Sequence, residues 1–330
     1  MQDAAARALP GDEPMAALWR GPLIESVHRG RAVYCGPGGE VLEATGDPEG
    51  YVYVRSSAKP FQALPLVLSG AADAFGLTEK EIAVACASHS GEDHHLSAVR
   101  SLLDKAGLSG ETLQSGPHPP FYAPATAQLA RDGEKPRPIH GNCSGKHAGM
   151  LALCVYEGWS LRDYRSPGHP LQKAISDVVA SICGLSPDEL ILGGDGCGVP
   201  AFALPLKNLA TGFARLAAGK QVSDSLSEGC KRIRDAMRAN PLTVAGTGRF
   251  DTWLMQNTAL LAKGGAEGVF ACGNTDGWGM AIKISDGAGR AVKPVVLSML
   301  DQRGIVPSSP EPDPVSDLHG EVVGSMETIR

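Results

Sequence analysis

The only Ser-x-x-Lys motif in the sequence lies at residues 56–59, directly before a long apolar run. A serine hydroxyl is a weak nucleophile at neutral pH and needs a neighbouring base. A lysine amine can be that base when burial or another cation lowers its pKa from about 10.4. If a helix begins near Ser57, Ser56 and Lys59 share one face of its first turn. The motif therefore predicts a serine–lysine pair, although a capping serine and a solvated lysine would have the same letters.

Two further polar segments could complete such a site. Ser88 lies in a loop of small residues, and Lys263 precedes two glycines just before a predicted strand. A Ser-x-x-Lys, then a second serine in a polar loop, then a lysine at a C-terminal strand is the order found in the penicillin-recognising enzymes. Their Ser-Asp-Asn and Lys-Thr-Gly motifs are absent from this sequence. The similarity is therefore one of order and context.

Two glycine-rich segments contain residue types that bind metals or substrates: Cys143, Lys146, His147, Asp195 and Cys197. Two cysteines on different loops with a nearby histidine could bind zinc. Lysine is an unusual ligand because it must first lose a proton. The residues alone leave two other interpretations open, a pair of small buried thiols or a cysteine nucleophile at Cys143 assisted by His147.

Hydrophobic periodicity predicts the elements that position these residues. Strand patterns occur near both ends of the chain, at residues 23–34, 40–44, 51–54, 267–273 and 279–285. Helical patterns occur at residues 78–85, 95–108, 148–156, 169–183, 204–218, 222–239, 252–263 and 290–300. We therefore expect an α/β fold, with a mostly antiparallel sheet built from both chain ends, helices on its faces and an inserted helical lobe.

We expect one two-lobed catalytic domain over residues 19–302. Its sheet would come from about residues 22–55 and 266–302, with the helical lobe between them. Residues 1–18 are predicted to be a disordered leader, since their start lacks the basic region and apolar core of a secretory signal. Residues 303–330 are predicted to be an extended tail with a short docked piece.

The composition excludes several classes of function. The net charge of −6 argues against non-specific binding of nucleic acid. No apolar run is long enough for a transmembrane helix, so no membrane association is expected. Eight scattered cysteines without an export signal predict reduced thiols and a cytoplasmic location. Enzymes of this size are often two-fold dimers, so we expect a homodimer.

Five segments in order resemble the rhizobial-type (thermolabile, type II) L-asparaginase family: residues 56–62, 87–92, 140–150, 195–200 and 263–269. The resemblance covers roughly residues 23–300. It implies a fold like that of the serine β-lactamases and glutaminases, and hydrolysis of L-asparagine to L-aspartate and ammonia. It also places two serine–lysine pairs on Ser56 with Lys59 and on Ser88 with Lys263.

The resemblance further implies a Zn²⁺ site and a set of substrate contacts: Cys143, Lys146 and Cys197 for the metal, and Arg55, His147 and Asp195 for the substrate. A zwitterionic substrate needs a cation for its α-carboxylate and an anion for its α-ammonium group, and Arg55 and Asp195 have these charges. We expect zinc to tune or orient the substrate and not to generate the nucleophile.

Amide hydrolysis through an acyl-enzyme needs a nucleophile, a base and a proton donor for the leaving ammonia. Either Ser56 or Ser88 could be the nucleophile, and we favour Ser56 because of its predicted place at a helix N-terminus. Lys59 would be the base, with Lys263 lowering its pKa by repulsion. A glutaminase or another amide or β-lactam hydrolase on the same fold, and a non-catalytic amino-acid sensor, are the alternatives.

Overall fold

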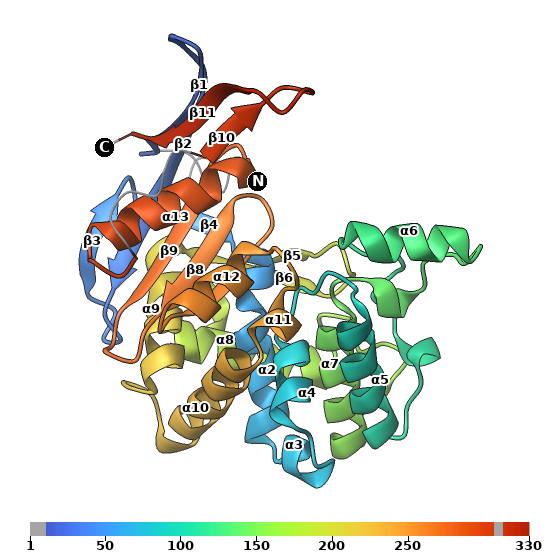
Figure 1. The fold of residues 1–330 in the computed structure, drawn as a ribbon. Coiled ribbons are helices and arrows are strands. Elements are labelled where there is room, and N and C mark those ends of the chain that lie inside the picture. Colours follow the sequence, from blue (N-terminus) through green and yellow to red (C-terminus); the bar gives the residue numbers. More distant parts are fainter. Residues whose placement is uncertain (1–10, 307–312, 330) are drawn as a thin grey trace.

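The computed structural model describes residues 11–306 and 313–329, and no helix there is long and apolar enough to cross a membrane. Within these ranges the largest element is an eight-stranded antiparallel sheet in the order β10-β11-β1-β2-β9-β8-β7, with β3 paired to β2 (Figure 1). Its strands are β1 Glu13–Arg20, β2 Leu23–Cys35, β3 Val41–Thr45, β7 Leu261–Gly264, β8 Val269–Gly273, β9 Gly279–Ile284, β10 Asp313–Ser316 and β11 Val322–Thr328. The sheet is therefore built from both ends of the chain, as predicted.

Helices cover both faces of this sheet. Gly279 faces α9 (Leu206–Ala218), where a Cβ would lie 2.0 Å from the carbonyl oxygen of Ala210. Gly279 pairs with the residue that follows Tyr34, so Tyr34 points to the opposite face. There its hydroxyl donates a 3.0 Å hydrogen bond to the Met299 carbonyl of α13 (Val292–Asp301). A glycine thus allows one helix to approach closely, and a tyrosine anchors the other.

A second, three-stranded antiparallel sheet in the described part of the chain has the order β4-β6-β5. Its strands are β4 Tyr51–Tyr53, β5 Ile191–Gly194 and β6 Pro200–Pro205. Beyond β4, the Val54 N–H donates to the Phe202 carbonyl at 2.9 Å. Beyond β5, the Asp195 N–H donates to the Val199 carbonyl at 2.9 Å. The small sheet therefore brings the segment before Ser56 beside the loop that carries Asp195.

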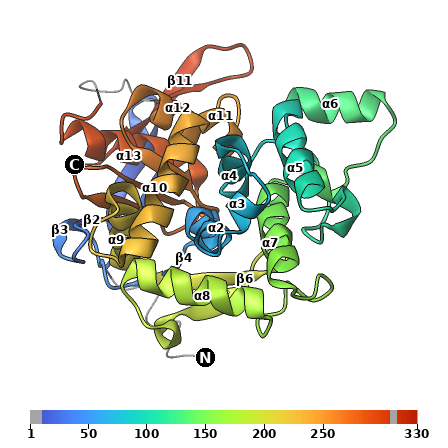
Figure 2. The ribbon, with the colours of Figure 1, turned by 90° about the horizontal axis from the view of Figure 1, so that it is seen from below.

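Helix α2 packs against several other helices, and Figure 2 shows it among α4, α7, α8 and α10. Residues 59–67 of α2 are all buried, as expected for a helix enclosed by other helices. Besides α9 and α13, the described helices are α2 Lys59–Leu68, α3 Ala71–Ala74, α4 Glu79–Ala85, α5 Asp93–Lys105, α6 Ala123–Arg131, α7 Ser144–Glu157, α8 Pro170–Cys183, α10 Asp224–Ala239, α11 Pro241–Val244 and α12 Phe250–Asn257. Short 3₁₀ turns are η1 Arg55–Ala58, η2 Gly110–Thr112, η3 Pro138–His140, η4 Pro187–Glu189 and η5 Gly289–Ala291.

Both ends of the chain differ from the expected boundaries. The predicted leader extended to residue 18, but β1 begins at Glu13; residues 1–10 lie outside the described ranges. The predicted tail over residues 303–330 contributes β10 and β11 to the sheet. β1 pairs with β11, with Leu18 opposite Met326, so each strand satisfies backbone groups of the other. The hydrophobic pattern of one strand does not show which distant segment of the chain it pairs with.

Two internal predictions were also wrong. The predicted helix over residues 252–263 ends at Asn257, because Thr258 adopts extended backbone (φ −137°, ψ 171°). Lys263 instead lies on β7, opposite Ala271 of β8. The predicted sheet segment 22–55 also divides between two sheets, since β4 belongs to the small one.

Candidate active site

Lys59 is a buried lysine at the start of α2 that reaches across to two loops. Its Nζ lies 2.9 Å from Ser88 Oγ, 2.8 Å from the Ala87 carbonyl and 3.4 Å from the Asn142 carbonyl. Only 1% of the residue is exposed. Burial lowers the pKa of Lys59, and the nearby Lys146 charge lowers it further against the opposing effect of Cys143. The structure therefore pairs Lys59 with Ser88, whereas the sequence predicted a pair with Ser56.

The backbone around Ser56 explains this difference. Residues 55–58 form a 3₁₀ turn, and α2 begins only at Lys59, so the two side chains do not share one α-helical turn. Arg55, directly before Ser56, has a left-handed φ of 50°, which is uncommon for a residue with a side chain. The half-buried Ser56 hydroxyl makes no hydrogen bond to any residue that the structure describes. Ser56 is therefore a serine just before the Lys59 helix whose hydroxyl has no hydrogen-bond partner among the described residues.

Lys263 lies at the end of β7 and is likewise buried. Its Nζ donates to the Gly264 carbonyl at 2.7 Å and lies 3.5 Å from Asp251 Oδ1. The predicted contact with Ser88 is not among its hydrogen bonds to described residues. Burial lowers the pKa of Lys263 to about 8, since the raising effect of Asp251 is opposed by Lys59 and Arg249.

The segment between residues 244 and 252 holds the Ser88 loop. The Ser88 N–H donates to the Val244 carbonyl at 3.0 Å, and Ser90 Oγ donates to the Ala245 carbonyl at 3.0 Å. The Glu92 carboxylate accepts hydrogen bonds from the Thr247 N–H at 2.8 Å and its hydroxyl at 2.6 Å. These four bonds fix the position of Ser88 relative to the segment that leads to β7.

Two cysteines, a lysine and an aspartate form a compact cluster beside Lys59. The ligand atoms of Cys143, Asp195 and Cys197 all lie within 4.8 Å of one another. Lys146 Nζ is 3.1 Å from Cys197 Sγ and 3.6 Å from Asp195 Oδ2. The hydrogen bond from Cys197 lowers the pKa of the Cys143 thiol well below its usual value. The three predicted metal ligands are thus together, with Asp195 added to them.

This donor set fits a zinc ion. Zn²⁺ binds thiolates and carboxylates, and a thiol with a lowered pKa is already close to its metal-binding form. Cys143, Cys197 and the Asp195 carboxylate, however, raise the pKa of Lys146 despite its burial. Metal binding at Lys146 would therefore have to displace a strongly held proton.

Asp195 also forms the bridge to Arg55. The Arg55 Nε donates to Asp195 Oδ1 at 3.1 Å, and Cys197 Sγ donates to Asp195 Oδ2 at 3.3 Å. Burial would raise the pKa of Asp195, but Lys146, the Cys197 hydrogen bond and Arg55 lower it to about 2. Asp195 is therefore an anion at neutral pH, adjacent to the cation predicted with it.

His147 presents an unused ring nitrogen in the buried interior. Tyr164 Oη accepts the Gln114 N–H at 3.0 Å and lies 2.7 Å from His147 Nδ1. The tyrosine hydroxyl can donate to Nδ1, and the neutral ring then carries its proton on Nε2. The Nε2 atom is buried and has no partner among the described residues. Burial, followed by Lys146 and Lys59, lowers the pKa of His147, so its ring stays neutral.

A second group of possible ligands, Glu92, His94 and His95, does not form a comparable site. His95 Nδ1 accepts the Glu92 N–H at 3.1 Å, and its Nε2 lies 2.8 Å from the Leu242 carbonyl, to which it donates. The Glu92 carboxylate is occupied by Thr247. The ring nitrogens of His95 therefore have no lone pair left for a metal. His95 is also fully buried.

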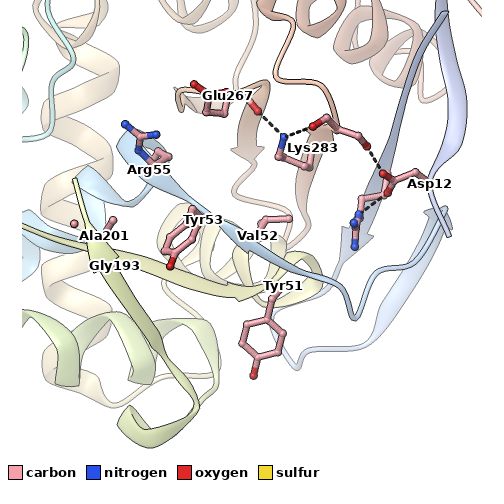
Figure 3. A pocket seen from close by; sticks show the side chains of 12 residues that line it. Asp12, Tyr51, Val52, Tyr53, Arg55, Gly193, Ala201, Glu267 and Lys283 are labelled. Carbon is pink, nitrogen blue, oxygen red and sulfur yellow. Dashed lines mark hydrogen bonds and ion pairs between the residues drawn. The ribbon is translucent and has the colours of Figure 1, made fainter. Parts of the chain in front are cut away.

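An elongated pocket of about 460 Å³ lies between the two sheets, and Figure 3 shows Arg55 at one end and Asp12 at the other. The charged side chains of Asp12, Arg31, Arg55 and Lys283 have partners. Arg31 is 2.9 Å from Asp12. The Lys283 amine donates to the carbonyl oxygens of Glu267 and its own neighbours. Arg55, held by Asp195, thus connects this pocket with the cysteine cluster.

Several residues at the site were missed by the sequence analysis: Glu92, Asn142, Tyr164, Thr247 and Asp251. Asn142 acts through its backbone carbonyl, for which no sequence signal exists. Asp251 had one usable signal, a single carboxylate in a mostly apolar segment twelve residues before Lys263. The remaining six cysteines are buried, and none of the eight, all within the described ranges, forms a disulfide.

The chain was compared with known proteins. The sequence profile of the family described as L-asparaginase II matches residues 16–327. A search of curated proteins found no match. Similar solved structures include the protein described as Mglu (14% identity, 86% of this chain and 69% of that chain, TM-score 0.39). Others are a probable glutaminase from Bacillus subtilis complexed with 6-diazo-5-oxo-L-norleucine (13%, 84% and 84%, 0.40) and a putative beta-lactamase from Bacteroides dorei DSM 17855 (12%, 83% and 93%, 0.43).

In other Mglu structures the matched region spans 61–66% of that chain. Since these identities and TM-scores are low, what those proteins bind is not transferred to this chain. The family profile, in contrast, covers nearly the whole sequence, including both serine–lysine regions and the cysteine cluster. The chain therefore belongs to the L-asparaginase II family and is an amidohydrolase.

Proposed function

We propose that this amidohydrolase converts L-asparagine to L-aspartate and ammonia through an acyl-enzyme, with Ser88 as nucleophile and Lys59 as base. The single observation that supports the assignment of roles is the 2.9 Å distance between Lys59 Nζ and Ser88 Oγ. This distance is within reach for direct proton transfer.

The surroundings of Lys59 suit a neutral amine. A neutral amine has two N–H donors and one lone pair. The carbonyl oxygens of Ala87 and Asn142 can accept the two donors, which leaves the lone pair to face the Ser88 hydroxyl. Burial favours this uncharged form by lowering the pKa of Lys59. The two carbonyls thus orient the base as well as bind it.

The reaction follows from this arrangement. Ser88 Oγ attacks the side-chain amide carbon of the substrate while its proton passes to Lys59. Lys59 then returns the proton to the amide nitrogen, the C–N bond breaks, and ammonia leaves an aspartyl ester on Ser88. Water, deprotonated by the same amine, hydrolyses the ester. Ser56, which the sequence analysis favoured, is the alternative nucleophile and otherwise a hydroxyl that binds the reacting carbonyl.

Substrate recognition would use the charges next to the serines. Arg55 would bind the α-carboxylate and Asp195 the α-ammonium group, because both already lie side by side with opposite charge. The unpartnered Nε2–H of His147 is a donor for a substrate oxygen. Leaving such a donor without a partner costs about 1–3 kcal/mol. Binding of substrate would therefore satisfy it.

Cys143, Lys146 and Cys197 would hold Zn²⁺ in this proposal, with Asp195 adjacent. When bound there, the ion would act as a Lewis acid that orients and polarises the substrate. The expected cytoplasmic location and homodimer remain predictions. Size-exclusion chromatography with light scattering would test the latter.

The experiment is to measure ammonia release from L-asparagine and L-glutamine by the wild type, Ser88→Ala and Ser56→Ala, each with and without added zinc. Rapid acid quenching during turnover, followed by peptide mass spectrometry, would locate the acyl group. We expect asparagine turnover to fall by about 10⁴-fold or more in Ser88→Ala, in line with the loss of a nucleophile, and less in Ser56→Ala. A full rate in Ser88→Ala with the acyl group on Ser56 would exchange the two roles. Faster turnover of glutamine would favour the glutaminase alternative.

A further inference from the structure

Asp251 is a buried carboxylate that the proposed reaction does not use. It lies in the first turn of α12, is 5% exposed, and faces the end of β7. Its Oδ1 accepts the Gly264 N–H at 2.5 Å and lies 3.5 Å from Lys263 Nζ. A buried charge is costly unless it is paired and hydrogen-bonded. Asp251 meets both conditions through two consecutive residues of one strand.

The strand that Asp251 holds lies against the turn that carries Ser56. β7 packs on η1, and a Cβ on Gly265 would lie 2.9 Å from the Val54 carbonyl. The segment just before Asp251 is the one that binds the Ser88 loop through the carbonyls of Val244 and Ala245. Asp251 is therefore the point at which the Ser88 support and the Lys263 strand are joined.

We propose that Asp251 is a positioning residue, whose carboxylate holds the Lys263 amine and the end of β7 in register with the two serines. This rests on the function proposed above and assigns to it a residue that does not touch substrate. The Lys263 amine has three possible N–H donors. Two of them are directed to the Asp251 carboxylate and the Gly264 carbonyl. The carboxylate thereby sets both the place and the charge of the amine.

The titratable and charged groups that face Lys263 determine its pKa. Asp251 and Arg249 face it from α12 and its cap, Lys59 from α2, and Cys86 from the end of α4. Asp251 raises the pKa of Lys263, and Lys59 and Arg249 lower it. Removing the carboxylate charge should therefore shift the Lys263 pKa downward from about 8, by roughly 1 unit or more for a lost partner at this distance.

The test compares Asp251→Asn with the wild type by two measurements. The first follows the lysine side-chain NMR signals against pH, with Lys263→Met identifying the Lys263 signal; it needs no turnover. The second is the pH profile of kcat/KM for L-asparagine. We expect the Lys263 pKa and one limb of the profile to move together to lower pH. Asp177→Asn, which removes the exposed partner of Lys173 on α8, is the matched control and should move neither.

Asp251→Glu separates positioning from simple structural support. Asp251→Glu retains the charge, so we expect it to keep the Lys263 pKa near the wild-type value. We also expect it to recover most of the kcat lost in Asp251→Asn. This comparison remains informative even if Asp251→Asn folds poorly. An unchanged Lys263 pKa in Asp251→Asn would overturn the proposal, as would a shifted pKa with a pH profile that does not move. If the wild type hydrolyses no asparagine, the NMR titration still decides the Asp251–Lys263 link, so that failure would concern the reaction alone.

Discussion

Lys59 and Lys146 are two buried lysines with opposite surroundings. They are 1% and 3% exposed, respectively. Lys59 is met by two backbone carbonyls and a hydroxyl, whereas Lys146 is met by the Cys197 thiol and the Asp195 carboxylate. The pKa of Lys59 is lowered and that of Lys146 is raised. Burial alone would lower both.

The difference shows that neighbouring charge decides what a buried lysine can do. An amine among neutral dipoles loses its proton readily and can act as a base. An amine among anions keeps its proton and balances their charge. The site therefore offers one candidate base, Lys59, and one candidate anion partner or metal ligand, Lys146.

Removing the Lys59 amine gives the largest expected effect and tests the first half of this comparison directly. Lys59→Met should lower kcat for L-asparagine by about 10²–10⁴-fold, because it removes the proton shuttle from Ser88. Steady-state ammonia release, with circular dichroism as a check of folding, measures this. Lys173→Met, on the exposed face of α8, is the control and should keep the full rate. A Lys59→Met variant as active as the wild type would contradict the role of Lys59 as base.

Removing the Cys143 thiol tests the second half of the comparison, the cluster around Lys146. Cys143→Ser should weaken zinc binding by at least about 10–100-fold, the loss seen even for outer-shell partners of a metal site. Competition with a chromogenic chelator and metal analysis of the dialysed protein measure this. Cys154→Ser, a buried thiol far along α7 from the cluster, is the control. Equal zinc content in both variants would show that the cysteine cluster is not a metal site.

A smaller effect concerns stability and pH. The pKa of Lys263 is about 8 in the folded protein and about 10.4 in an unfolded chain. Between these values the unfolded chain binds more protons, so the contribution of Lys263 to stability rises with pH, by at most about 1.4 kcal/mol per pH unit. Lys263→Met removes this contribution. Denaturant unfolding at pH 7.5, 8.5 and 9.5 should therefore show the wild type gaining stability relative to Lys263→Met as pH rises; a constant difference would contradict the lowered pKa.

Much of the fold could be predicted from periodicity. The strand at residues 23–34 and the helix at residues 169–183 agree with β2 and α8 within one residue at each end. The strand has an alternating pattern and the helix has one apolar face, and the local sequence shows both. β1, β10 and β11 were missed, because their stability comes from pairing between the two chain ends. β7 was merged into a helix, because three of its four residues are buried in succession and show no alternation.

The sequence by itself selected most of these residues, because they lie in or next to polar and glycine-rich segments. The structure brings Lys59 to Ser88 and gathers Cys143, Lys146, Asp195 and Cys197 into one cluster. Only the tertiary structure decided which side chains contact one another. The 3₁₀ turn after Arg55 separates Ser56 from Lys59, and the carbonyls of Ala87 and Asn142 direct Lys59 to Ser88. Backbone carbonyls carry no sequence signature, and Asp251 meets Lys263 only because a helix ends and a strand returns between them.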